Sequence, residues 1–250
     1  MKYMGSKRRM AKHLIPIILK NRKEGQWYIE PFVGGCNMID KIEGNRIGND
    51  YNKYLIAFWK AIQNNWIPPI HITKEEYYDI KENKDKFPAL TLWVGIGCSY
   101  CGKWFGGYVN NYPENRRLKS GVLPNYQIEA RNGLLKQKDA IKEIIFTDKS
   151  YEEIDYPEKS IIYCDPPYES TTKYKDDFNH KKFWDWCRDM TKKGHKVFIS
   201  EYNAPKDFIC LLEIKTNTQI SQGMKIGNIN KFEKLFIYSL NTSNTEKDGN

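Results

Sequence analysis

No apolar run in the sequence approaches the length of a membrane-spanning helix. The first 23 residues hold eight basic residues and no acidic one, a charge bias that targeting segments share. Their apolar piece, LIPIIL, has only six residues and contains Pro16. We therefore expect a cytoplasmic protein with no membrane partner.

The cysteines lack both the pattern of a secreted disulfide scaffold and the full ligand set of a zinc site. Six are scattered along the chain: Cys36, Cys98, Cys101, Cys164, Cys187 and Cys210. The spacing of Cys98 and Cys101 suits a metal ligand pair, but neither a second CxxC nor an HxxxH follows. We expect reduced thiols inside a cell and no metal cofactor.

The full GxGxxG fingerprint of dinucleotide-binding proteins is also missing. The stretch EPFVGGCNM (30–38) places Gly34 and Gly35 directly after a predicted strand, where glycine lets the backbone approach a ligand closely. Asp50 follows at the end of the next predicted strand, where a carboxylate can accept both hydroxyls of a ribose. This pattern favours a nucleoside ligand without phosphates, and an NAD-dependent dehydrogenase fits it worst.

Positive charge is what the sequence has in excess. Forty Lys and Arg residues against 31 Asp and Glu residues give a formal net charge of +9. Such a surplus suggests a polyanionic partner, most simply a nucleic acid. With 250 residues, 40% of them hydrophobic, the chain is long enough for one sizeable domain that carries an insertion.

Strand and helix patterns alternate over most of the chain. Strands are predicted at 26–30, 45–50, 142–148, 160–165 and 195–202, helices at 52–66 and 180–193, a Pro16-containing helix from Ser6 to about Asn21, and a late edge strand at 234–240. This alternation predicts an α/β fold with a mostly parallel sheet and helices on both faces. Four of the predicted strands end in an acidic residue, at the edge where such sheets bind ligands: Glu30, Asp50, Asp148 and Asp165.

The alternation breaks between residues 67 and 138. We predict an inserted subdomain there, with 1–66 and 139–250 forming the main domain. After a short helix around KEEYYDIKENK, the segment becomes rich in glycine and aromatic residues, among which stand the basic residues Lys103, Arg116 and Arg117. Basic side chains can anchor phosphates while their neighbours read base edges. The competing interpretation is a small aromatic core with a solvated basic rim.

The stretch SIIYCDPPYES (160–170) ends an apolar run with an aspartate, two prolines and a tyrosine. Proline lacks an N–H donor and disfavours a helical residue before it, so the strand must stop at Cys164. Asp165 and Tyr168 would then lie on a stiff turn. Most Pro-Pro pairs only end a strand. The functional alternative is a rigid platform that holds a carboxylate, backbone carbonyls and a ring beside a substrate.

Taken in order, these pieces resemble the Dam-like (D12 class) N6-adenine-specific DNA methyltransferases, a family with a Rossmann-like fold that uses S-adenosylmethionine. KYMGSKRR (2–9) matches the N-terminal Lys-aromatic-x-Gly-x-Lys motif, EPFVGG the glycine motif, NDYNKYLI (49–56) the ribose-binding aspartate motif and DPPY the catalytic motif. SYCGKWFGGY (99–108) resembles a segment of phage and bacterial members. The resemblance covers the chain from Lys2 to about Tyr168.

The resemblance implies roles for individual residues. Those implied for the S-adenosylmethionine site are Tyr3, Lys7, Glu30, Phe32, Gly34, Asp50, Asp148 and Asp165. The catalytic turn would be Asp165, Pro166, Pro167 and Tyr168, and Lys2 would approach DNA. It would join Lys103, Arg116 and Arg117, which the basic and aromatic composition of the insertion indicates as DNA contacts. The chain departs from the family where the glycine turn reads GGC instead of Gly-x-Gly, and where Tyr3 stands in place of the Trp of some members.

The chemistry of the residues agrees with these roles. The exocyclic amine of adenine is a poor nucleophile, because its lone pair is delocalised into the ring. Asp165 and the Pro166 carbonyl can both accept its protons and align that lone pair with the sulfonium methyl group, which requires neither a metal nor a covalent intermediate. Because the amine is out of reach inside a duplex, the base must flip out, and Tyr168 is the ring on which it would stack.

We therefore expect a site-specific DNA methyltransferase (adenine-specific), EC 2.1.1.72, that acts on double-stranded DNA as a monomer in a bacterial or phage-infected cell. A cognate restriction endonuclease is a candidate partner. One alternative is an N4-cytosine DNA methyltransferase, since the aspartate of the turn favours adenine without excluding cytosine. The other is a catalytically idle DNA-binding relative, against which the intact Asp50, Asp165 and Tyr168 argue.

Overall fold

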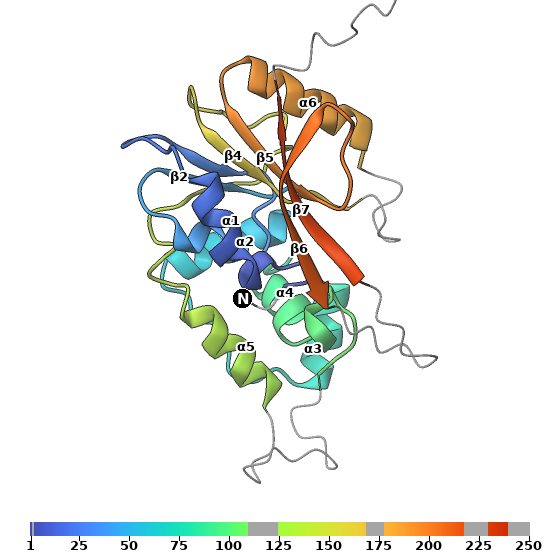
Figure 1. Cartoon of the computed structure of the whole chain (residues 1–250). Coiled ribbons are helices and arrows are strands. Elements are labelled where there is room, and N and C mark those ends of the chain that lie inside the picture. The colour runs from blue at the N-terminus through green and yellow to red at the C-terminus, as the bar shows by residue number, and fades with distance from the viewer. Residues whose placement is uncertain (2, 110–124, 169–177, 218–229, 240–250) are drawn as a thin grey trace, which may run out of the picture. The chain divides into compact units, whose positions relative to one another are not determined.

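The computed structural model describes residues 1, 3–109, 125–168, 178–217 and 230–239 (Figure 1). The chain divides into two compact units. The first comprises Met1–Ala11 and Val33–Ile154, and the second comprises Lys12–Phe32 and Asp155–Asn250. The fold is α/β, as predicted, and the described residues include seven strands of a mixed sheet. Among the described residues, no helix combines the length and apolar character that crossing a membrane requires.

The first unit contains a pair of parallel strands, and a helix follows the first of them. Strand β2 (Arg46–Asn49) pairs in parallel with β3 (Ile145–Thr147). Helix α2 (Lys53–Gln63) follows β2 and is capped by Asn52, whose side-chain oxygen accepts a hydrogen bond from the Tyr54 N–H at 3.1 Å. The cap fixes the point at which the chain leaves the sheet, immediately after Asp50.

Helix α2 is held by the apolar stripe that its sequence predicts. Leu55, Ile56, Trp59 and Ile62 recur at helical spacing and all are buried. The Trp59 ring stacks on Phe146 of β3 with 6.3 Å between ring centroids. The packing ties the helix to the β2–β3 pair and so positions the carboxyl ends of both strands.

The described part of segment 67–138 is helical. Its elements are α3 (Lys74–Glu82), α4 (Pro88–Leu92), the π-helix η3 (Trp93–Gly97), the 3-10 helix η4 (Tyr100–Gly102) and α5 (Tyr126–Leu135). The first of these is the predicted short helix, and it begins with a capping box between Thr73 and Glu76. The boundaries proposed for an inserted subdomain, at 67 and 138, stay a prediction.

The described residues of the second unit form strands in the order β1-β4-β5-β7-β6. Strands β1 (Tyr28–Glu30), β4 (Ile161–Cys164) and β5 (Lys196–Glu201) are parallel, whereas β7 (Asn230–Tyr238) runs antiparallel to both β5 and β6 (Phe208–Asn217). Figure 1 shows β6 and β7 as the orange-to-red pair. Helix α6 (His180–Lys192) packs against β5 and buries Phe183, Trp184, Cys187 and Met190.

The edge strand was predicted wrongly. The strand expected at 234–240 is the interior strand β7, and the outer strand is β6, which the sequence patterns did not reveal. Register explains the order, because Phe198 of β5 lies opposite Ile237 of β7, and Ile209 of β6 lies opposite the same residue. Strand β6 therefore exists as a strand chiefly through its pairing with β7.

The N-terminal helix is shorter and more broken than predicted. Ser6 does act as a cap, accepting the Arg8 N–H at 3.3 Å, but it caps the 3-10 helix η1 (Lys7–Arg9). Helix α1 (Ala11–Ile18) follows and contains Pro16. The tighter hydrogen bond from the Met10 N–H to the Lys7 carbonyl, at 2.8 Å, separates the two segments.

Candidate active site

In the first unit, the glycine turn lies under the ring of Tyr3. Its chain is anchored where the Val33 N–H donates to the Asn49 carbonyl at 2.7 Å. Gly34 has φ +46°, and a Cβ atom built there would lie 3.0 Å from Cε1 of Tyr3. At Gly35 such an atom would lie 2.8 Å from the Cβ of Tyr3. Only glycine allows this close approach, and the structure thus brings together two residues predicted for the cofactor site.

Cys36 explains the departure from the Gly-x-Gly pattern. Its φ is +52°, in the left-handed region that glycine adopts most readily. The backbone therefore keeps the conformation expected of a glycine, although a buried cysteine occupies the position.

Asp50 joins the end of β2 to the glycine turn. Its Oδ2 accepts the Gly34 N–H at 3.1 Å, and its Oδ1 accepts the Asn52 N–H at 3.0 Å. Burial raises the pKa of Asp50 to about 6, and the hydrogen bonds from the Asn52 and Gly34 N–H groups oppose this shift. A carboxylate offers about four lone-pair positions, so two remain for the two hydroxyls of a ribose.

Two residues that the sequence did not single out hold this corner of the site. Nε1 of Trp59 donates to the Gly34 carbonyl at 3.0 Å. The buried amide of Asn49 donates to the Lys149 carbonyl at 2.9 Å and accepts the Lys149 N–H at 3.0 Å. Asn49 thereby fixes the loop after β3, where Asp148 lies exposed to solvent.

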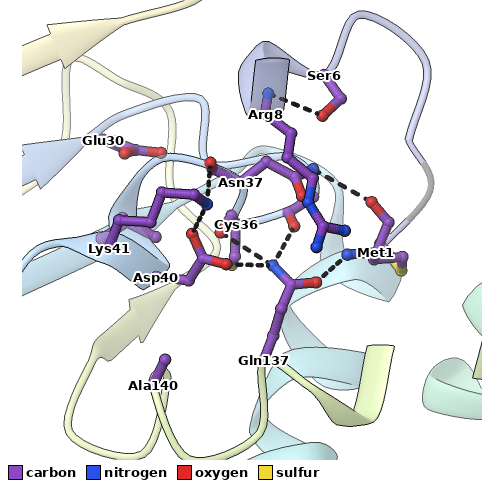
Figure 2. A network of polar contacts seen from close by, with 12 residues as sticks. Met1, Ser6, Arg8, Glu30, Cys36, Asn37, Asp40, Lys41, Gln137 and Ala140 are labelled. Carbon is purple, nitrogen blue, oxygen red and sulfur yellow. Dashed lines mark hydrogen bonds and ion pairs between the residues drawn. The ribbon is translucent and has the colours of Figure 1, made fainter. Parts of the chain in front are cut away.

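A third such residue is Gln137, which braces the glycine turn through a buried amide (Figure 2). Its Nε2 donates to the carbonyls of Gly35 at 3.2 Å and Cys36 at 3.1 Å, and to Oδ2 of Asp40 at 2.9 Å. Its Oε1 accepts a hydrogen bond from the amino group of Met1. Since an isolated glutamine belongs to no motif, only the folded chain reveals this role.

Lys7 lies inside the N-terminal motif. Its side chain is buried, and its Nζ donates to the Gly5 carbonyl at 3.2 Å. Two residues earlier, the Tyr3 carbonyl accepts the Ser6 N–H at 3.2 Å, so the chain folds back between Tyr3 and Lys7. The N-terminal motif is thus a compact turn and its lysine points inward.

In the second unit, β4 ends at Cys164 as predicted, and the DPPY turn follows. Asp165 is half-buried and Pro166 is buried. The Tyr168 hydroxyl donates to Oε2 of Glu233 at 2.7 Å. Burial, followed by the nearby charges of Asp165 and Glu233, raises the pKa of Tyr168 well above its usual value, so the hydroxyl keeps its proton.

Glu30 and Phe32 lie in the second unit with the DPPY turn. The carboxylate of Glu30 is buried and accepts the Tyr28 hydroxyl at 2.9 Å. Phe32 makes edge-to-face contacts with Phe178 and Phe183, each with 5.8 Å between ring centroids. These contacts hold both residues in fixed positions at the carboxyl end of β1.

The remaining predicted residues are less informative. Lys2, Arg116 and Arg117 lie outside the described residues, and Lys103 is exposed. Cys98 is buried, which raises the pKa of its thiol to about 12, whereas Cys101 is exposed. Within the described ranges, no cluster of three or more His, Cys, Asp or Glu residues could hold a metal ion.

Comparison with known proteins identifies the family of the chain. The sequence model of the family described as D12 class N6 adenine-specific DNA methyltransferase matches residues 3–92 and 107–235, which is most of the chain. The type II methyltransferase M.FokI of Planomicrobium okeanokoites is 23% identical over 207 residues. That alignment covers 74% of this chain but 31% of the relative, so the chain spans about a third of its length. The chain belongs to the D12 class of N6 adenine-specific DNA methyltransferases.

Proposed function

We propose that the protein transfers a methyl group from S-adenosylmethionine to the N6 amine of an adenine in double-stranded DNA. The observation that carries the proposal is the DPPY turn at Asp165–Tyr168, which directly follows a buried parallel strand and lies within the range that the family model matches. Ligands of parallel sheets bind at this end of the strands.

The cofactor half of the proposal depends on the first unit. Asp50 would accept the ribose hydroxyls with its two remaining lone-pair positions, while Tyr3 and the glycine turn would line the pocket. Lys7 and Asp148 are assigned to the same ligand, and Glu30 and Phe32 to its methionine end. When bound, S-adenosylmethionine would supply the electrophilic methyl group of its sulfonium, whose C–S bond breaks as the new N–C bond forms, leaving S-adenosylhomocysteine as the product.

The catalytic half depends on the turn itself. The Asp165 carboxylate and the Pro166 carbonyl would accept hydrogen bonds from the two protons of the adenine amine and direct its lone pair outward. A proton leaves the amine after transfer, to solvent. Pro167 stiffens the turn, and Tyr168 would stack on the flipped base, for about 1–3 kcal/mol.

The DNA contacts complete the proposal. Lys103, Arg116 and Arg117 would bind the duplex, with Lys2 beside them, and the net charge of +9 favours such a partner. We assign the protein to the cytoplasm of a bacterial or phage-infected cell, where its substrate lies. We expect it to act as a monomer, with a cognate restriction endonuclease as a candidate partner.

The deciding experiment is to incubate unmethylated genomic DNA with the protein and S-adenosylmethionine, digest the DNA to nucleosides and identify the modified one. N6-methyl-2′-deoxyadenosine, absent from a parallel reaction with Asp165→Ala, supports the proposal. N4-methylcytosine would replace it with the cytosine alternative. Cofactor binding without transfer to any duplex would indicate an idle relative.

A further inference from the structure

Strand β7 brings a carboxylate to the DPPY turn. The antiparallel ladder between β5 and β7 pairs Glu201 with Lys234. One position further along, Tyr202 follows Glu201 and Glu233 precedes Lys234, so these two residues lie at the same end of the ladder. Both contact Tyr168, which is the last described residue of the turn.

The two contacts fix different parts of the Tyr168 ring. The hydroxyl donates to Oε2 of Glu233 at 2.7 Å, a short hydrogen bond to a charged acceptor. The ring of Tyr202 meets that of Tyr168 edge to face, with 4.7 Å between centroids and 86° between planes. A hydroxyl tether at one end and a perpendicular contact with the Tyr202 ring together define the plane of the Tyr168 ring.

Burial makes the tether important. Tyr168 is 9% exposed, so its hydroxyl would find little water in place of Glu233. A buried hydroxyl that loses its acceptor is strongly disfavoured, and the side chain would turn to find another partner. Such a turn moves the ring away from the plane in which a base can stack.

We propose that Glu233 is a positioning residue, which holds the Tyr168 ring in the orientation that stacks on the flipped adenine. The inference rests on the proposed function, because it assigns Glu233 a part in the same transfer. It differs from two simpler roles for a carboxylate at this place: a contact that only stabilises β7, and a charge that only affects the electrostatics of the turn.

A double-mutant cycle tests the hydrogen bond. Tyr168→Phe and Glu233→Ala each remove it from one side, and the double variant removes both partners. We expect each single change to lower kcat about tenfold while the KM for S-adenosylmethionine stays within about twofold of wild type. The double variant should be no slower than the slower single variant, because both changes remove the same interaction. Losses in kcat that multiply would overturn the inference.

Glu233→Gln separates positioning from charge. The glutamine amide keeps an oxygen that can accept the Tyr168 hydroxyl but removes the negative charge, so we expect kcat within about threefold of wild type. A loss as large as that of Glu233→Ala would overturn positioning in favour of charge. A fall in the thermal midpoint of Glu233→Ala with an unchanged kcat would overturn it in favour of strand stability.

Glu213→Ala serves as the matched control. Glu213 is a carboxylate on the neighbouring strand β6, is exposed, and pairs with Lys234 at 3.3 Å. This variant should keep wild-type kcat. If the wild-type protein methylates no duplex at all, the proposed function itself fails. If the wild-type protein and Glu233→Ala transfer the methyl group at the same rate, the proposed function stands and only the role of Glu233 fails.

Discussion

The backbone N–H of Gly34 donates a hydrogen bond of 3.1 Å to Oδ2 of Asp50, which stands 16 residues later in the chain. The residue proposed to bind the ribose is therefore also the residue that shapes the glycine turn. Since the same carboxylate also accepts the Asn52 N–H at the start of α2, its ionisation affects the whole corner of the site.

This relationship predicts a pH dependence of cofactor binding. Burial raises the pKa of Asp50 to about 6, and the protonated carboxyl can accept fewer hydrogen bonds. The affinity for S-adenosylmethionine should therefore be about tenfold lower at pH 5 than at pH 8. Calorimetric titrations across this range measure it, and Asp50→Asn should bind weakly with a flat profile. A wild-type profile equally flat would contradict the prediction.

Protonation of Asp50 does not itself destabilise the fold. Because the folded-state pKa of Asp50 is above its unfolded value, the folded protein binds this proton more tightly. The contribution of Asp50 to the free energy of unfolding therefore falls as the pH rises from about 4 to 6, and is recovered on acidification. Thermal midpoints measured alongside the titrations would show whether the protein stays folded where binding weakens.

Gln137→Leu should weaken both the fold and the cofactor site. The change preserves the bulk of the side chain but removes the donor to the carbonyls of Gly35 and Cys36, at a cost of about 1–3 kcal/mol in the free energy of unfolding. We expect a raised KM for S-adenosylmethionine as the turn loosens. Gln63→Leu is the control, because its amide donates to the carbonyls of Ile141 and Ile144 instead. A KM raised equally in both variants would mean that general destabilisation is responsible.

Asp165→Ala should lower kcat by roughly 10²–10³-fold, because the amine loses an acceptor that holds it in the reactive orientation. DNA affinity should change little, since phosphate contacts dominate it. Single-turnover methylation and fluorescence anisotropy with duplex DNA measure the two quantities separately. Retained turnover would remove Asp165 from the mechanism.

Arg116→Ala combined with Arg117→Ala should weaken DNA binding and reduce its salt dependence. If both residues contact phosphates, the slope of log K against log salt should fall by about 2. Lys192→Ala with Lys193→Ala removes the same charge from the exposed end of α6 and should leave the slope unchanged. Equal slopes in the two double variants would favour the competing interpretation, in which the arginines belong to a solvated basic rim and do not contact DNA.

Local signals account for what could be predicted from the sequence. The prolines at 166 and 167 stop β4 at Cys164 because they lack backbone donors, a rule that operates within a few residues. Helix α2 is equally local, since its cap and apolar stripe lie within 52–63. Strand β6 escaped prediction because it depends on pairing with β7. The braces at Asn49, Gln137 and Glu233 escaped it because their partners lie about 65 to 100 residues away.

The position of Gln137 has a consequence for protein engineering. Exchanging segments between related enzymes is a natural route to new target sequences, and the insertion predicted at 67–138 is the cassette that such an exchange would use. The last turn of that cassette nevertheless supplies the amide that holds Gly35 and Cys36. A chimaera joined downstream of Gln137 would replace this glutamine with the residue that the other enzyme has at the same position, beside the proposed cofactor pocket. A junction placed within 125–136 would keep Gln137 and exchange only the residues upstream of the junction.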